Sequence, residues 1–254
     1  MPATGPSFRV KMAETEAERT AAQALRYEVF VRELGAKGGS VDHERGLESD
    51  RFDRFFDHLL VYDTATEQAV GGYRLLRSDQ ARAAGQFYSE DEYDLGPLKA
   101  SGKRLLELGR SCLHRDYRGG MAMFHLWNGL AQYVDTHQID VLFGVASFHG
   151  TDVGKLALPL SFLHHHHLAP PELRVRALPE QFQAMDLIAE GRLDRKAAMV
   201  QTPALIKAYL RLGGYVGLGA CIDHAFNTTD VCLVIDTARM NQRQRRLYST
   251  ERAG

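Results

Sequence analysis

Charged side chains interrupt apolar runs at several points of this chain. Glu107 and Arg110 lie in LLELGRSCL, where the neighbouring leucines favour burial. A charge persists in such surroundings mainly when it is paired. A partly buried carboxylate could instead accept a proton from an amine, an arginine could clamp a carboxylate, and an aspartate could receive an ammonium. The residues of this kind are Arg26, Glu44, Asp50, Asp53, Arg74, Glu107 and Arg110.

A second candidate site is the turn Arg118-Gly119-Gly120, between an apolar strand and an amphipathic helix. Backbone N–H groups at the start of a helix are unpaired and can bind an anion, such as a pyrophosphate or the phosphate of phosphopantetheine. Gly-Gly is equally typical of a tight connection. The basic residues in and around the turn are expected to surround it with positive charge: Lys99, Lys103, Arg104, Arg110, Arg115 and Arg118.

Glu107 and Arg110 are three residues apart and would lie on opposite faces of a regular strand. Gly109 is therefore a candidate site for a β-bulge, which would splay the strand from its neighbour and expose backbone donors. Such a gap could admit a pantetheine arm, with N–H groups near Ser111 or Cys112 polarising a thioester carbonyl.

The hydrophobic pattern predicts one mixed α/β domain. A helix is expected over 14–34, ending at Gly35, and an antiparallel hairpin over 58–62 and 69–76. After a polar excursion over 78–101 come a strand from Leu105, a helix over 121–138 and a strand over 141–146. Further helices are expected over 152–164 and 203–212, and strands over 174–177, 214–222 and 231–235. The domain is expected to span 8–237, followed by a basic, flexible tail over 238–254.

The formal net charge of −1 argues against a dedicated nucleic-acid binder. Three cysteines without CxxC spacing favour buried free thiols and a cytoplasmic protein. No secretory signal and no run of about 20 apolar residues is present, so a soluble or peripheral protein is expected. The tail holds five Arg, so a solvated segment is expected, with attraction to anionic membrane lipids as the alternative.

Three other patterns resemble reactive or metal sites. Four consecutive histidines, 164–167, cannot all face one ion, so no metal site is expected. Ser147, His149 and Asp152 lack the G-x-S-x-G context of a serine nucleophile. Cys112 lacks an identifiable partner histidine. Direct transfer without a covalent enzyme intermediate is therefore favoured.

A series of motifs from Leu25 to Asp236 resembles the ornithine N-acyltransferases of bacterial ornithine-lipid synthesis, hemolysin-like members of the GCN5-related N-acetyltransferase (GNAT) superfamily. The series is LRYEVFVREL, FDRFFDHLLVYD, VGGYRLL, FYSEDEYDL, LELGRSCLHRDYRGG, LWNGLAQYV, VLFGVASFHGTD, SFLHHHHLAPPELRVRA and PALIKAYLRLGGYVGLGACIDHAFNTTDVCLVID. More distantly, acyl-homoserine-lactone synthases are similar in the order of Arg26, Phe30, Asp50, Asp53, Arg74, Glu107 and Arg110.

The resemblance implies a GNAT-like α/β (α+β) domain whose central mixed sheet is flanked by helices and splayed at the acyl-donor site. It implies transfer of a 3-hydroxyacyl group from acyl carrier protein to the α-amine of L-ornithine, giving lyso-ornithine lipid, with no tightly bound cofactor.

Charge matching assigns hypothetical roles to the candidate residues. The candidate catalytic residues are Glu107, Glu44 and Arg110. Glu107 is the first candidate for accepting the amine proton and Glu44 the second, and tight pairing of Arg110 with Glu107 would weaken the first. The donor would be bound by Ser111, Cys112, Arg115, Arg118, Gly119 and Gly120, and the acceptor by Arg26, Phe30, Asp50, Asp53 and Arg74. The charged residues could equally form a structural network.

Several alternatives remain open at this stage. The acceptor could be glycine, lysine or glutamine, and the donor could be coenzyme A. A signal synthase of the homoserine-lactone type would require S-adenosylmethionine. A noncatalytic carrier-binding protein would show no amine-dependent turnover.

Overall fold

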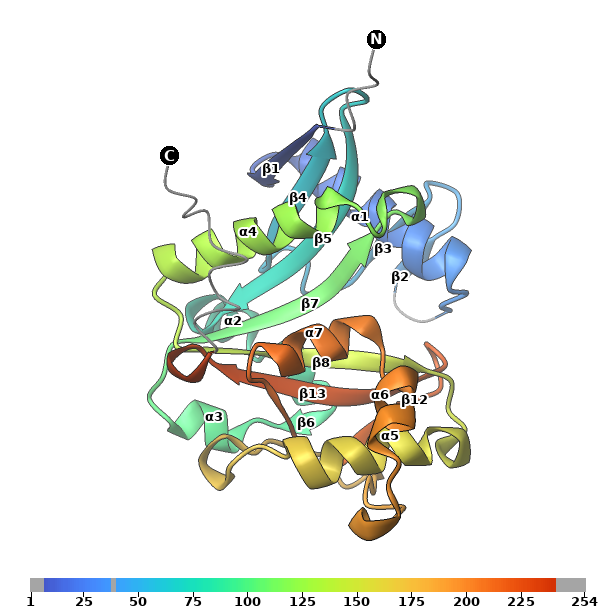
Figure 1. The fold of residues 1–254 in the computed structure, drawn as a ribbon. Coiled ribbons are helices and arrows are strands. Elements are labelled where there is room, and N and C mark those ends of the chain that lie inside the picture. The colour runs from blue at the N-terminus through green and yellow to red at the C-terminus, as the bar shows by residue number, and fades with distance from the viewer. Residues whose placement is uncertain (1–6, 38–39, 241–254) are drawn as a thin grey trace, which may run out of the picture. The chain divides into compact units, whose positions relative to one another are not determined.

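The structure is a computed structural model that describes residues 7–37 and 40–240 (Figure 1). The chain divides into two compact units. Of the described residues, 7–37, 40–84 and 108–138 form the first unit, and 85–107 and 139–240 form the second. Strand β7 (Leu105–Leu113) contributes to both units.

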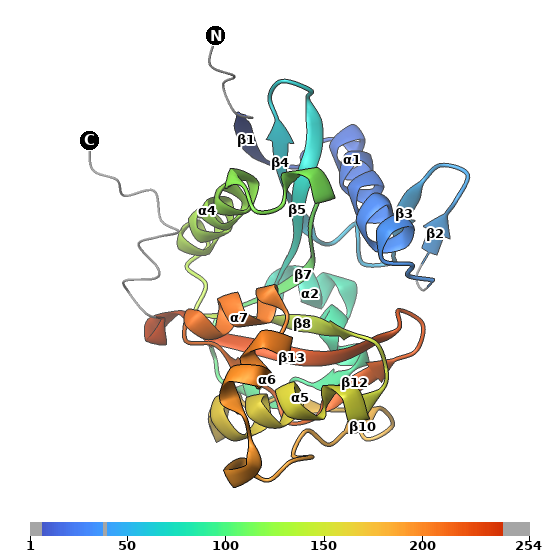
Figure 2. The same cartoon turned by 45° about the vertical axis from the view of Figure 1, so that its right-hand side comes forward.

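The first unit is built on a sheet with the strand order β1-β4-β5-β7. Strands β1 and β4 are antiparallel, as are β4 and β5, and β2 and β3 form a separate hairpin. Helices α1 and α4 cover opposite faces of β4 and β5 (Figure 2). The elements are β1 (Phe8–Met12), α1 (Glu16–Arg26), the π-helix η1 (Tyr27–Glu33), β2 (Ser40–Asp42), β3 (Leu47–Ser49), β4 (Asp57–Asp63), β5 (Gln68–Arg77), α2 (Ser78–Ala84), the 3₁₀ helix η3 (Arg115–Tyr117) and α4 (Met121–Thr136).

Local sequence signals explain how α1 begins and how the helical segment ends. The Thr15 side chain accepts from the Glu18 backbone N–H while the Glu18 carboxylate accepts from the Thr15 N–H, which is a capping box. Helix α1 passes directly into η1, and Gly35 follows with a φ of +72°, a conformation that glycine adopts without steric cost.

The second unit is built on the order β7-β8-β13-β12-β10, and β11 pairs with β13. Residues Leu105–Glu107 of β7 pair in parallel with Val141–Phe143 of β8, whereas β8, β12 and β11 are antiparallel to β13. Helix α5 packs on α6, and α7 packs on β13. The elements are η2 (Tyr88–Asp91), β6 (Tyr93–Asp94), α3 (Gly96–Ala100), β8 (Val141–His149), α5 (Val153–His167), η4 (Pro171–Leu173), β9 (Arg176–Ala177), β10 (Phe182–Gln183), η5 (Glu190–Arg192), α6 (Arg195–Gln201), α7 (Ala204–Arg211), β11 (Tyr215–Val216), β12 (Ala220–Asp223), β13 (Thr228–Asp236) and η6 (Thr237–Arg239).

The mixed α/β fold and its main helices and strands are confirmed. The segment expected as a polar excursion over 78–101 is different: it contains α2, η2, β6 and α3. Helix α5 extends through the four histidines. The domain boundary and the splaying of the sheet stay predictions, and the tail from residue 241 lies outside the described residues.

Candidate active site

A buried network of ion pairs occupies the first unit. Arg26, from the last turn of α1, donates from Nη2 to Asp53 Oδ2 at 2.6 Å. Arg74, in the middle of β5, donates from Nη1 to Asp53 Oδ1 at 2.7 Å. Burial by itself raises the pKa of Asp53, but the two guanidinium groups outweigh it and hold the pKa at about 2. Asp53 is therefore ionised and bridges two buried cations.

Glu48 extends the network and was not among the residues singled out from the sequence. It is 1% exposed and accepts from Arg26 Nε through Oε2 and from Arg110 Nε through Oε1, the latter at 3.2 Å. Asp50 accepts from Arg74 Nη1 at 2.6 Å and lies 3.6 Å from Arg110 Nη2. Three arginines and three carboxylates thus share one cluster: Arg26, Arg74, Arg110, Glu48, Asp50 and Asp53.

The predicted acceptor residues are brought together, with one exception. Arg26, Asp50, Asp53 and Arg74 belong to the network, whereas Phe30 packs with an apolar cluster of Leu25, Val29 and Cys112. Within the described residues, the buried Nη1 of Arg26 has no hydrogen-bond partner. A small pocket lies beside this network and is lined by Arg26, Arg74 and Arg110 together with Ala22, Leu25, His58, Leu60, Gly72, Tyr73 and Cys112.

The backbone of β7 is irregular at Arg110. This residue has a φ of +49°, in the left-handed region, which costs a non-glycine residue roughly 1–2 kcal/mol. The irregularity was expected at Gly109, one position earlier, and Gly109 itself does not have a positive φ. The conformation accompanies the contacts of the Arg110 side chain with Glu48 and Asp50.

Glu107 belongs to the second unit and holds the start of η2. Its carboxylate is 2% exposed and accepts from the Tyr88 N–H at 2.7 Å, from the Ser89 N–H at 2.6 Å and from the Ser89 hydroxyl. Both carboxylate oxygens therefore already accept protein donors. Glu44, the second candidate base, is exposed in the turn between β2 and β3.

The predicted anion-binding turn has the expected backbone. It follows η3, Gly119 has a φ of +75°, and Gly120 is the N-cap of α4. Among the described residues no side chain caps this N-terminus, so its first N–H groups are directed at the space in front of the helix. Arg115 and Arg118 are both exposed, and Arg118 forms a bidentate pair with Glu33.

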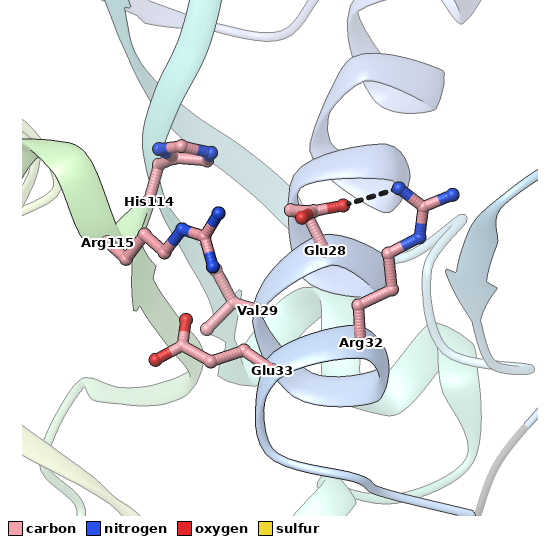
Figure 3. A pocket seen from close by; sticks show the side chains of 6 residues that line it. All are labelled: Glu28, Val29, Arg32, Glu33, His114 and Arg115. Atoms are coloured by element: carbon pink, nitrogen blue, oxygen red, sulfur yellow. Dashed lines mark hydrogen bonds and ion pairs between the residues drawn. The ribbon is translucent and has the colours of Figure 1, made fainter.

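A small pocket of about 60 Å³, open to solvent, lies between η1 and the end of β7 (Figure 3). Its lining is strongly charged and includes both ends of the pair Arg32–Glu28, which is drawn as a dashed line. The lining residues are Glu28, Val29, Arg32, Glu33, His114 and Arg115.

The cations between Lys99 and Arg118, expected to surround the turn with positive charge, each lie close to a carboxylate. Lys99 pairs with Glu90, Lys103 with Asp236, and Arg104 with Asp140. Arg110 and Arg118 pair with Glu48 and Glu33, and Arg115 lies 3.8 Å from Asp116. Most of these partners are distant in the chain, as Asp236 is from Lys103 and Glu33 is from Arg118.

The cysteines are buried free thiols, as predicted. Burial raises the pKa of Cys112 and of Cys221 to about 12, and it also raises that of Cys232, so all three thiols are neutral at pH 7. Ser111, beside Cys112, is half-buried in β7.

The other sequence patterns have structural positions. Asp152 caps α5 by accepting from the Gly154 N–H at 3.1 Å. His165 makes a 3.0 Å contact with the Ile188 carbonyl oxygen at the end of the same helix. Throughout the described part of the chain, no helix is both long and apolar enough to cross a membrane.

Comparison with known proteins gives a consistent family. Residues 25–128 match the model of the acetyltransferase (GNAT) domain. An L-ornithine N(alpha)-acyltransferase of Rhodobacter capsulatus is 56% identical, with 98% of this chain and 97% of that protein covered. The corresponding protein of Brucella abortus is 46% identical, with 96% and 90% covered.

Two solved structures share the fold at low identity. An N-acyl amino acid synthase from uncultured soil microbes, FeeM, has a TM-score of 0.51 and 11% identity, covering 98% of this chain and 97% of that one. The CoA-dependent acyl-homoserine lactone synthase BjaI, with MTA, has a TM-score of 0.53 and 16% identity, covering 96% and 88%. At these identities the likeness concerns the fold alone.

Proposed function

Since this chain belongs to the family of L-ornithine N(alpha)-acyltransferases, we propose that it transfers a 3-hydroxyacyl group from acyl carrier protein to the α-amine of L-ornithine. The α-amine nitrogen attacks the thioester carbonyl, the carbon–sulfur bond breaks, and an amide and a free carrier thiol form while the amine loses a proton. The product is a lyso-ornithine lipid. The observation that carries this proposal is the identity of 56% over nearly the whole of both chains.

The donor is proposed to bind at the turn before α4. Its phosphopantetheine phosphate would accept from the N–H groups of the uncapped helix start and of Gly119 and Gly120, next to exposed Arg115. Backbone N–H groups near Ser111 or Cys112 are proposed to polarise the thioester carbonyl. Two observations support this assignment: the absence of a side-chain cap on α4 among the described residues, and the positive φ of Gly119.

The acceptor is proposed to bind beside the buried network. The Nη1 group of Arg26, without a partner in the described structure, would donate to the ornithine carboxylate. Asp50 would receive the side-chain ammonium, because its side chain is 13% exposed and that of Asp53 is 9% exposed. Asp53 accepts from two arginines at 2.6 and 2.7 Å, whereas Asp50 accepts from one at 2.6 Å and lies 3.6 Å from the second. Asp53 would then position the arginines.

The amine needs little help to lose its proton. An α-amine with a pKa of about 8 is roughly one-tenth neutral at pH 7, so positioning is the main task. Glu107 and Glu44 stay predictions as proton acceptors. The three protein donors on Glu107 favour a positioning role for this carboxylate instead.

Mass spectrometry of lipids tests the proposal. The protein is expressed in a host that makes no ornithine lipid, beside the variant Asp50→Asn. A 3-hydroxyacyl-ornithine should accumulate with the native protein and to a smaller extent with the variant. Accumulation of another N-acyl amino acid would show that the acceptor is not ornithine. Accumulation of an acyl-homoserine lactone would show that the protein catalyses a different reaction.

A further inference from the structure

The feature that the proposed chemistry does not use is the pairing of Arg118 with Glu33. Nη1 of Arg118 donates to Glu33 Oε1 at 2.6 Å, and Nη2 donates to Oε2 at 2.7 Å. Such parallel bonds fix the plane and position of a guanidinium as well as its charge. The contact joins the turn before α4 to the last residue of η1.

The same guanidinium is also bound to the end of β7. Nε and Nη2 of Arg118 donate to the Leu113 carbonyl oxygen at 3.1 and 3.0 Å. Together with the two bonds to Glu33, these engage four of the five N–H groups that an arginine offers. An incoming phosphate would have to break existing bonds to gain more than one new bond from this side chain.

The π-helix explains how Glu33 reaches the turn. The Leu34 N–H donates to the Val29 carbonyl oxygen at 3.2 Å, a bond between residues five apart. Residues five apart on an α-helix point in directions about 140° apart, yet Glu28 and Glu33 line the same pocket (Figure 3). Segments of π-helix are rare and occur often at functional sites.

A second contact holds the residue before Arg118. The Tyr117 hydroxyl donates to Asp63 Oδ2, at the end of β4, at 2.7 Å. Tyr117 and Arg118 are thus both tied to the body of the unit by side chains. The side chain of Arg115 is 69% exposed and that of Arg118 is 43% exposed, and Gly119 and Gly120 present only backbone to the space before α4.

We propose that Arg118 and Glu33 form a clamp that positions the donor-binding turn, and that Arg118 is a positioning residue, with Arg115 as the cation presented to the donor phosphate. This inference rests on the proposed binding of a phosphopantetheine thioester at the turn. It assigns to η1 the task of holding the turn in the conformation that directs N–H groups at the phosphate.

The direction in which Glu33→Gln changes the affinity for phosphate distinguishes a positioning role of Arg118 from direct binding of the phosphate by Arg118. Glu33→Gln removes the negative partner of Arg118 with little change in volume. If Arg118 were itself a phosphate ligand, its release from Glu33 would strengthen phosphate binding. If Arg118 positions the turn, the same substitution weakens phosphate binding, because the turn loses its attachment to η1.

The experiment measures the dissociation constants of 4′-phosphopantetheine and of unphosphorylated pantetheine by calorimetry. The phosphate preference is the dissociation constant of pantetheine divided by that of 4′-phosphopantetheine. This ratio should exceed one in the native protein, and Glu33→Gln and Arg118→Lys should each reduce it about 3- to 10-fold. Glu28→Gln is the matched control, because Glu28 lines the same pocket and pairs with Arg32 of the same helix at 3.1 Å. The phosphate preference of Glu28→Gln should stay within twofold of the native value.

Two results would overturn the clamp: a phosphate preference that is unchanged or increased in Glu33→Gln, or no preference in the native protein. Thermal unfolding of each variant, together with the affinity for pantetheine, distinguishes a local effect from a loss of folded protein. Because no acceptor is present, this measurement stands apart from the proposed function. Absence of ornithine acylation, with the preference retained, would contradict the function and leave the clamp supported.

Discussion

At the scale of single residues, the buried charges of this protein are organised by their partners. Asp53 shows the principle most clearly, since each of its carboxylate oxygens accepts from a different buried arginine. Removing one member of such a cluster leaves an unpaired charge in the interior and costs more than the pair contributes as a whole. Substitutions here therefore affect stability as well as substrate binding.

Asp53→Asn should lower the free energy of unfolding by about 3 kcal/mol at pH 7. The folded-state pKa of Asp53 is about 2, below the ordinary value of a carboxyl near 4. Its contribution is therefore complete above about pH 4 and is lost as the pH falls toward 2. The difference from the native protein should shrink by about 2 kcal/mol over that interval. Urea unfolding of both proteins at pH 7 and at pH 3 should show about 1 kcal/mol of this decrease, since pH 3 lies midway through the interval. A difference between the two proteins that is independent of pH would contradict the ion-pair account.

Glu107→Gln separates positioning from proton transfer. Glutamine keeps one oxygen acceptor but turns its amide NH₂ either toward the Tyr88 N–H or toward the donors of Ser89, at a cost of about 2 kcal/mol. The melting temperature and kcat/KM should both fall, while the shape of the pH profile of kcat/KM stays the same. Loss of the acidic limb of that profile at an unchanged melting temperature would instead identify Glu107 as the proton acceptor.

At the scale of elements, the strand β7 and helix α4 define the donor turn between them. Gly120 is the N-cap of α4 with φ −106° and ψ −161°, an extended backbone that serine, a preferred N-cap residue, also adopts. A hydroxyl at this position would accept from the N–H groups of the first turn. The serine hydroxyl and a bound anion would then compete for the same N–H donors.

Gly120→Ser should therefore increase the free energy of unfolding by a few tenths of a kcal/mol, with a slightly higher melting temperature. It should also raise the KM for the donor several-fold. Gly120→Ala is the matched control, because a Cβ there would meet the Tyr117 carbonyl oxygen at 3.8 Å, an ordinary contact, and adds no acceptor. The donor KM of both variants is measured by steady-state kinetics at varied donor concentration. An unchanged donor KM in the serine variant would exclude the helix start as the phosphate site.

At the scale of the whole molecule, the sequence predicted the long elements because each carries a clear hydrophobic period or strand pattern. The strand β7, the hairpin β4–β5 and helices α1 and α4 are of this kind. Short elements such as β2, β3 and α6 contain too few residues to show a period. The segment 78–101 is largely polar, and its short helices and strand could not be predicted for the same reason.

The candidate site was predictable only in part. Arg74 and Glu107 could be singled out because a charge inside an apolar strand requires a partner. The identity of the partner could not be predicted: Glu107 binds backbone N–H groups of the missed helix η2, and Arg26 binds Glu48 of the missed strand β3. Likewise, the basic segment looked unpaired because Glu33, Asp140 and Asp236 are distant in sequence from their partners.

The central claim concerns the acceptor and the donor together, so the most direct measurement is a competition assay with purified protein. Equal concentrations of ornithine, lysine, glycine and glutamine are offered with 3-hydroxyacyl-acyl carrier protein or with the matching coenzyme A thioester, and the amides are quantified by mass spectrometry. The account predicts Nα-acylated ornithine as the main product, formed faster from the carrier protein. A different main product, or faster transfer from coenzyme A, would contradict it.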